Sequence, residues 1–239
     1  MTDYLDIADN GESASLVSPT LCIVLLTYQR TDLALRTIQG VVENLDYPNR
    51  TWYIADDGSP GNHLQTLLDE LGNKGENVYA HHNENFGKRP FCGKGWNYAL
   101  NRVHNLTDYV LWLEDDWHLE RRLDVRPYVR VLMERPDVGM ITMRGLSLGL
   151  RMEVTGHRGI HYAKVLREGN HHSMAYSGNP LIRHVRYMEY GLFSNMDTPG
   201  DIEVDYDNRY RGHHGPDIWR PAEINGWGIW GHIGNARTW

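Results

Sequence analysis

The chain has 239 residues and a formal net charge of −7, with 41% hydrophobic and 23% charged residues, which are ordinary values for a globular protein. Its longest apolar runs are well short of the roughly 20 residues that span a bilayer. Residues 1–20 carry acids but no Lys or Arg, unlike a secretory signal. We therefore expect a cytoplasmic protein. The body of the chain is nearly balanced in charge, which argues against tight nonspecific binding to nucleic acid.

Apolar runs of strand length alternate with helical periodicities through the first half of the chain. Residues 1–18 are polar and aperiodic and are expected to form a loose acidic arm. Thr31 is expected to cap the first helix, Pro48 to stop it, and Gly72 to close the second helix. In chain order, strands are predicted at residues 21–26, 51–55, 77–80, 109–113 and 138–143, and helices around apolar stripes at residues 35–45, 64–71, 96–103 and 125–132.

This order of elements predicts an α/β fold with a mostly parallel sheet, right-handed crossovers and helices on both faces. The second half is less regular. Residues 145–180 are predicted to form hairpins and loops, residues 181–191 a helix, and residues 195–239 an irregular segment over the sheet edge. Because no linker interrupts the chain, we expect residues 19–239 to form a single domain.

Polar clusters follow three of the predicted strands, at the end where α/β sheets bind ligands. The sharpest is Glu114-Asp115-Asp116, which follows five apolar residues without a break. Burying adjacent carboxylates without partners costs several kcal/mol each, and hard oxygen ligands suit Mn²⁺ or Mg²⁺. The position therefore favours a divalent-cation site over the alternative, a solvated acidic turn.

A second cluster, Asp56-Asp57-Gly58-Ser59, taken alone is a turn that caps the next helix. Beside the acidic triplet, one of its two Asp residues is expected to accept a hydrogen bond from a nucleobase N–H or a ribose hydroxyl. Lys88 and Lys94 lie in a glycine-rich loop and are predicted to contact phosphate. The alternative for these two side chains is that they are simply solvated.

These motifs, in this order and spacing, resemble the nucleotide-sugar-binding half of GT-A-fold glycosyltransferases, particularly the large inverting family 2. The resemblance implies that residues 19–145 bind a nucleotide sugar and residues 146–239 bind the acceptor. The matching segments are Thr27-Tyr28-Gln29-Arg30 for the family's Thr-Tyr-Asn-Arg, Asp56-Asp57-Gly58-Ser59 for its Asp-Asp-Gly-Ser, Asn85-Phe86-Gly87 with Asn97 for its Asn-x-Gly…Asn, and Glu114-Asp115-Asp116 for its Asp-x-Asp metal motif.

The resemblance implies a role for each of these acids. Asp116 would bind Mn²⁺ or Mg²⁺, which bridges the diphosphate of the nucleotide sugar, and Glu114 and Asp115 would face the sugar or the ribose. Such a cation offsets the charge that builds on the leaving diphosphate. Asp57, or Asp56 as the weaker candidate, would contact the base. The residues expected beside the base are Thr27, Tyr28 and Arg30.

Inverting transfer also needs a general base that takes the proton of the acceptor hydroxyl. Asp205 lies in a run that resembles the family's Glu-Asp-Tyr-Asp context and is the candidate, with an acidic surface loop as the alternative. The resemblance further implies a late histidine that binds the metal, for which His232 is the candidate and His213-His214 the rival. The acidic rivals of Asp205 are Asp201, Glu203 and Asp207.

We therefore expect a metal-dependent, inverting glycosyltransferase that moves a sugar from a nucleotide sugar, most favoured as a UDP-sugar, to an acceptor hydroxyl. A glycan, a lipid-linked sugar or a protein is the default acceptor. Aromatic faces suit sugars and bases alike, and the Trp residues expected to stack on the acceptor are Trp219, Trp227 and Trp230.

Two alternatives stay open. One is the same chemistry on a hydroxymethylated base in DNA, as in phage enzymes that act in the host cytoplasm. The other is a protein of a different class, either a nucleotidyltransferase or a non-catalytic nucleotide-sugar-binding module. A nucleotidyltransferase usually has a Gly-x-Gly-x-Arg loop, which residues 27–30 do not provide. The basic residues that keep the DNA alternative open are Arg121, Arg122, Arg126 and Arg130.

Overall fold

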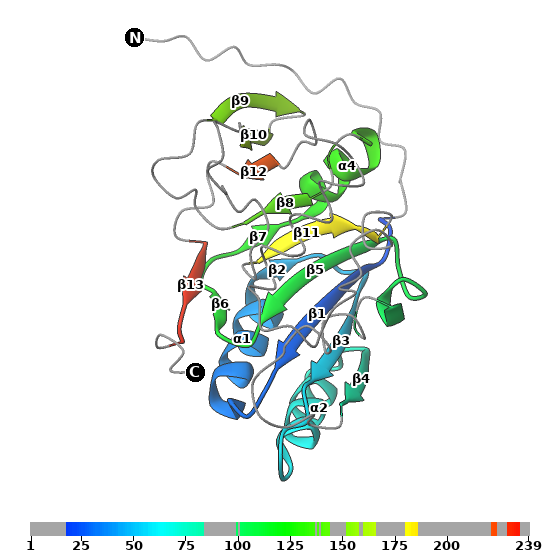
Figure 1. Ribbon diagram of the computed structural model, residues 1–239, viewed down its shortest axis with the longest axis vertical. Coiled ribbons are helices and arrows are strands. Elements are labelled where there is room, and N and C mark those ends of the chain that lie inside the picture. The colour runs from blue at the N-terminus through cyan, green and yellow to red at the C-terminus, as the bar shows by residue number, and fades with distance from the viewer. Residues whose placement is uncertain are drawn as a thin grey trace, which may run out of the picture.

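The computed structural model describes residues 18–83, 99, 101–136, 138, 140–143, 152–157, 160–165, 180–185, 221–223 and 229–234. Over these residues the chain has the predicted α/β architecture, in which one large sheet crosses the molecule and helices pack against it (Figure 1). Of the described helices, none has both the length and the apolar character needed to cross a membrane. The division of the chain near residue 145 stays a prediction.

Nine strands of the described residues form the large sheet, in the order β4-β3-β1-β5-β11-β8-β12-β10-β9. The strands from β4 to β5 are parallel, as predicted, whereas β11 lies antiparallel between β5 and β8 and makes the rest of the sheet mixed. The strands are β1 (Leu21–Thr27), β3 (Arg50–Asp56), β4 (Val78–His82), β5 (Tyr109–Glu114), β8 (Met140–Thr142), β9 (Met152–His157), β10 (Ile160–Val165), β11 (Leu181–His184) and β12 (Pro221–Glu223).

Both faces of the sheet are covered around β1, which is why β1 is a continuous apolar run. Leu21 and Ile23 belong to a core cluster with the helices on one face. Cys22 and Val24 point to the opposite face, where they pack with residues such as Val103. The helices that contribute to the first cluster are α1 (Thr31–Asn44), α2 (His63–Asn73) and α4 (Arg126–Glu134).

Two short ladders lie outside the large sheet. β6 (Trp117–Leu119) directly follows the acidic triplet and pairs antiparallel with β13 (Trp230–His232), beside α1 (Figure 1). β2 (Leu45–Asp46) pairs with β7 (Leu123–Asp124). Gly40 allows α1 to lie close to β6, because a Cβ at this position would lie 2.6 Å from the Nδ1 atom of His118.

The prediction of a helix over residues 181–191 is wrong at its beginning, because Leu181–His184 forms β11, and residues 186–191 lie outside the described part of the chain. This segment pairs with β5 on one side and with β8 on the other. Strand geometry satisfies the backbone groups of both neighbours, and this long-range requirement outweighs the local helical pattern. The predicted hairpins are confirmed in part, since β9 and β10 pair antiparallel.

Three predicted helix boundaries also need correction. Thr31 does not cap α1 but is its first residue, and its hydroxyl contacts His63 instead. α1 ends at Asn44 rather than at Pro48, because the chain then enters β2. α2 continues past Gly72, and the backbone reverses at Gly75, whose φ of 74° favours glycine.

Candidate functional site

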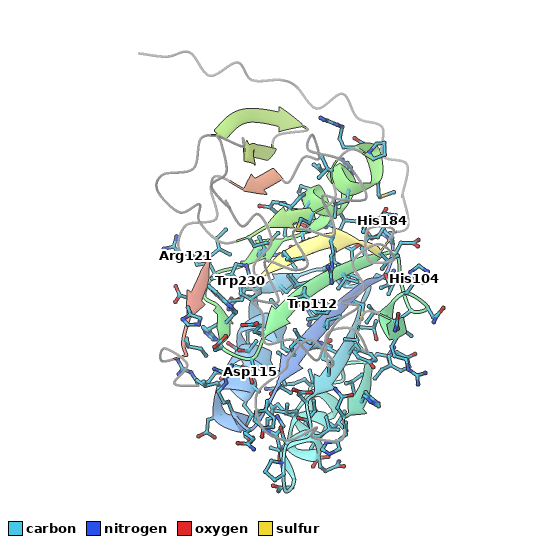
Figure 2. All side chains as sticks on the ribbon, viewed as in Figure 1. His104, Trp112, Asp115, Arg121, His184 and Trp230 are labelled. Carbon is cyan, nitrogen blue, oxygen red and sulfur yellow. The ribbon has the colours of Figure 1, made fainter. Side chains whose placement is uncertain are left out.

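The carboxyl ends of β1, β3 and β5 bring the three predicted polar clusters to one edge of the sheet. In the register of these strands, Thr27 pairs with Asp56 and Leu26 pairs with Glu114. Figure 2 shows Asp115 just beyond the carboxyl end of β5, next to α1. Parallel pairing therefore places acids that are far apart in the sequence around one point.

Asp115 and Asp116 are both buried, with about 1% of each residue exposed. Arg30 bridges them: its guanidinium donates to Asp115 Oδ1 and, at 2.8 Å, to Asp116 Oδ2. Burial disfavours the charged guanidinium, but the two carboxylates outweigh this effect and raise the pKa of Arg30. One guanidinium thus contacts two adjacent carboxyl groups, so it can compensate only one of the two charges that the pair carries when both groups are ionised.

The carboxylate of Asp115 is surrounded by protein donors. Its Oδ2 accepts hydrogen bonds from the Thr27 hydroxyl at 3.0 Å and from the backbone N–H of Tyr28 at 3.2 Å, while Arg30 holds Oδ1. Burial raises the pKa of Asp115 above its ordinary value, and Arg30 and these hydrogen bonds oppose that shift. In this structure, Asp115 therefore organises the end of β1 rather than pointing into open space.

The carboxylate of Asp116 differs, because its Oδ1 is buried and has no hydrogen-bond partner among the described residues. The Nε2 atom of His232 lies 3.4 Å from the other oxygen, Oδ2. The β6–β13 ladder positions this histidine: His232 pairs with Trp117, and their rings lie 4.9 Å apart. Gly234 lies so close that a Cβ would sit 2.6 Å from Asp116 Oδ2.

A carboxylate with one unpartnered oxygen and an imidazole nitrogen near its other oxygen is suited to a divalent cation, since Mn²⁺ and Mg²⁺ take carboxylate oxygens and imidazole suits transition metals. The described residues contain no group of three or more His, Cys, Asp or Glu side chains close enough to bind a metal together. Within the described residues, Asp116 and His232 could supply two ligands to a cation, and any others would have to come from elsewhere.

At the end of β3 the two acids have different surroundings. Asp56 is fully buried; it accepts hydrogen bonds from the backbone N–H and the hydroxyl of Ser59, and it lies 2.6 Å from His82 Nδ1. Asp57 is only half-buried, and its Oδ1 lies 3.5 Å from Asn83 Nδ2. Burial raises the pKa of Asp57 to about 6, with a smaller contribution from the charge of Asp56 and an opposing one from Asn83.

The structure brings together most of the predicted site residues that it describes. Glu114 is half-buried at the end of β5. One prediction needs correction: Trp230 is 7% exposed and belongs to the helix-side core, so it does not offer its ring to an acceptor. The predicted residues that lie outside the described part of the chain are Lys88, Lys94, Asp201, Glu203, Asp205, Asp207, His213, His214, Trp219 and Trp227.

Sequence reasoning did not assign a role to His63, which lies beside Thr27. Its ring nitrogens contact the hydroxyls of Thr27 and Thr31. The available signal was weak: His63 stands one position before the predicted apolar stripe of α2.

The arginine cluster is partly neutralised by acids. Arg122 and Arg126 lie 2.8 Å and 3.4 Å from Asp46, and Arg126 also pairs with Asp124.

Comparison with solved structures identifies the architecture as the GT-A fold of glycosyltransferases. S. aureus TarS, residues 1–349 in complex with UDP-GlcNAc, matches with a TM-score of 0.61 and 14% identity over 92% of this chain and 62% of that one. The mannosyltransferase PcManGT of Pyrobaculum calidifontis, in complex with GDP-Man and Mn²⁺, matches with a TM-score of 0.58 and 15% identity over 90% and 59%. The chain thus spans about three-fifths of the length of these structures.

The sequence places the chain more narrowly. Residues 22–190 match the profile of Glycosyl transferase family 2, so the chain belongs to this family. A search of curated proteins found no match. Membership in this family favours the expectation of glycosyl transfer over the nucleotidyltransferase alternative.

Proposed function

We propose that the protein transfers a sugar from a nucleoside diphosphate sugar, with a UDP-sugar as the favoured donor, to an acceptor hydroxyl with inversion at the sugar carbon. The observation that carries the proposal is the buried pair Asp115–Asp116 at the end of β5, with one unpaired carboxylate oxygen. Buried carboxylates that keep an excess negative charge are costly unless a cation compensates them. A divalent cation bound at this edge of the sheet would compensate such a pair.

Asp116 and His232 are the residues that would hold Mn²⁺ or Mg²⁺. When bound, the cation supplies positive charge for the leaving diphosphate. Arg30 keeps Asp116 in place through its 2.8 Å contact with Oδ2, while Oδ1 has no partner among the described residues. Asp115 in this proposal positions the end of β1 through Thr27 and Tyr28, and the partly exposed Glu114 at the end of β5 faces the sugar or the ribose.

Asp57 is proposed to bind the base of the nucleotide. It is half-buried, whereas both oxygens of Asp56 already contact protein groups. An ionised carboxylate accepts hydrogen bonds only, so Asp57 suits an imide N–H such as that of uracil. The TarS structures with UDP and UDP-GlcNAc support a uridine donor, and the PcManGT complex with GDP-Man keeps a guanosine donor as the second choice.

For the acceptor half, Asp205 stays the proposed general base on the strength of the sequence resemblance. It would take the proton of the acceptor hydroxyl as the hydroxyl oxygen bonds to the sugar carbon and the sugar–phosphate bond breaks. A glycan, lipid-linked or protein acceptor is preferred to DNA, because acids neutralise two of the four clustered arginines, Arg122 and Arg126. Duplex-DNA binding that weakens steeply with salt would reverse this preference.

The proposal is tested by thermal unfolding in the presence of UDP-GlcNAc or GDP-Man, each with and without Mn²⁺. A ligand at 100 times its Kd adds about 2.7 kcal/mol to the stability of the native state. We expect a nucleotide sugar to raise the Tm only when Mn²⁺ is present. Release of UDP or GDP from the donor, measured with and without candidate acceptors, then tests transfer directly.

Asp116→Asn is the decisive variant, and Asp69→Asn on the exposed face of α2 is its matched control. Asn keeps the shape of the side chain but lacks the charge that holds a cation. We expect Asp116→Asn to lose the Mn²⁺-dependent Tm shift and donor turnover, and Asp69→Asn to keep both. A wild-type protein that binds no nucleotide sugar under any metal condition would refute the proposal, as would unchanged turnover in Asp116→Asn.

A further inference from the structure

We propose that His63 is a positioning residue of the donor site: its imidazole, protonated on Nε2, orients the Thr27 hydroxyl so that Thr27 donates to Asp115. The inference rests on the proposed function and deepens it by adding a residue that acts through another on the acid pair.

The placement of His63 is the first step. It is the first residue of α2 and only 4% exposed. Its Nε2 lies 2.9 Å from the hydroxyl oxygen of Thr27, the last residue of β1, and its Nδ1 lies 2.7 Å from that of Thr31, the first residue of α1. One ring thus links the beginnings of two helices to the end of the central strand.

The direction of the hydrogen bonds follows from Asp115. The Thr27 hydroxyl, the Tyr28 N–H and the Arg30 guanidinium all donate to the carboxylate oxygens of Asp115. The one O–H of Thr27 is therefore directed to Asp115 Oδ2, which lies 3.0 Å away. The Thr27 oxygen must then accept from His63, which places the proton of the ring on Nε2.

The other ring nitrogen completes the chain of hydrogen bonds. In a neutral imidazole with a proton on Nε2, Nδ1 is an acceptor and receives the O–H of Thr31. Burial lowers the pKa of His63, an effect that the charges of Asp56 and Asp115 oppose. The resulting path runs from Thr31 through His63 and Thr27 to Asp115 and has a single consistent set of donors and acceptors.

The path acts on both acid clusters of the site. The backbone oxygen of Thr27 accepts the N–H of Asp57 at 3.0 Å, so this residue joins the end of β3 to Asp115. Thr37 of α1 binds the backbone oxygen of Asp115 at 2.9 Å from the other side. Because the Thr27 hydroxyl lies between His63 Nε2 and Asp115 Oδ2, we assign His63 to the orientation of Thr27.

Two conservative variants distinguish the contact of His63 Nε2 with Thr27 from the contact of its Nδ1 with Thr31. The amide nitrogen of Gln can reach the place of Nε2, so His63→Gln keeps a donor toward Thr27; the shorter His63→Asn reaches only the place of Nδ1 and contacts Thr31. We expect His63→Asn to weaken Mn²⁺-dependent UDP binding about tenfold in calorimetry, as expected for loss of one hydrogen bond in a buried network. His63→Gln should stay within about threefold of the wild type, and the Tm values of the two variants should be similar.

Thr27→Val provides the second arm. If His63 acts through Thr27, Thr27→Val weakens UDP binding as His63→Asn does, and the double variant is no weaker than either single one. The ¹⁵N spectrum of the wild-type imidazole gives an independent readout, in which we expect a neutral His63 that carries its proton on Nε2.

A proton on Nδ1, or equal losses of UDP binding in His63→Asn and His63→Gln, would overturn the assignment. Additive losses in the Thr27→Val double variant would do the same. The spectrum of the wild type decides the matter even if a variant does not fold. A wild type that binds no nucleotide while His63 carries its proton on Nε2 would refute the proposed function and leave the hydrogen-bond path standing.

Discussion

Replacing Arg30 with Gln removes the cation that two buried carboxylates share. The side chains of Asp115 and Asp116 are 2% and 1% exposed, and that of Arg30 is 28% exposed. Removing one partner of a buried ion pair costs about 3–5 kcal/mol, because the remaining charge is left uncompensated. Since the guanidinium is partly exposed, we expect Arg30→Gln to lower the free energy of unfolding by about 3 kcal/mol in metal-free protein near neutral pH.

Mn²⁺ should restore a large part of this loss. The divalent cation supplies the positive charge that Arg30 no longer provides. Adding Mn²⁺ should therefore raise the free energy of unfolding of Arg30→Gln by about 1–3 kcal/mol more than it raises that of the wild type. Urea unfolding with and without Mn²⁺ measures the difference between the two gains. The same experiment at acid pH should show a smaller effect of Arg30→Gln, because protonated carboxyl groups need no counter-charge.

Arg50→Gln is the matched control. Arg50 pairs with Glu76, with side chains 15% and 10% exposed, and it begins β3 at the end of the strand opposite the site. Arg50→Gln should destabilise the protein by a similar amount. The stability that Arg50→Gln gains on addition of Mn²⁺ should equal the gain of the wild type. Equal Mn²⁺ gains in Arg30→Gln and Arg50→Gln would refute the reasoning that Arg30 and the metal compensate the same charge.

Three further outcomes are expected. The pKa of Asp57 in the folded protein is about 6, above its ordinary value of 3.8, so the stability of the wild type falls as the pH rises between these values. Asp57→Asn should therefore be more stable than the wild type by about 1–2 kcal/mol above pH 6 and equally stable below pH 4. Urea titrations at several pH values measure this difference. Gly234→Ala should weaken Mn²⁺ binding, as measured by electron paramagnetic resonance, because its Cβ would lie 2.6 Å from Asp116 Oδ2. Gly72→Ala is the control and should bind Mn²⁺ normally, since no heavy atom lies within 4 Å of its added Cβ. Trp230→Ala should lower the free energy of unfolding by about 3–5 kcal/mol, since the ring lies in the core; a loss below 1 kcal/mol would contradict that placement.

The central strands and their polar ends could be predicted from local sequence alone. The buried runs of β1 and β5 are continuous apolar segments, and each is followed at once by the residues that form the site. Such runs predict strands because the parallel strands of an α/β sheet are covered on both faces. Their carboxyl ends must then meet at one edge, which is how the acids of β3 and β5 could be assigned to one site before their positions were known.

Other features had no local signal. Leu181–His184 forms a strand because it pairs with β5 on one side and with β8 on the other, and no pattern within these residues predicts that pairing. Trp230 was expected to stack on an acceptor, but the pairing of β13 with β6 places its side chain in the core.

The sequence by itself therefore determined the family, the parallel half of the sheet and the acids at its edge, because these depend on motifs and periodicities a few residues long. Only the tertiary structure decided which carboxylate oxygens of Asp115 and Asp116 have hydrogen-bond partners among the described residues and which has none. Asp115 and Asp116 are neighbours in the chain, but Thr27, 88 residues away, turns one toward the end of β1, while β13 brings His232 to the other. Hydrogen bonds and burial at such separations depend on which distant segments pair in space, as β13 does with β6, and local periodicity does not specify such partners.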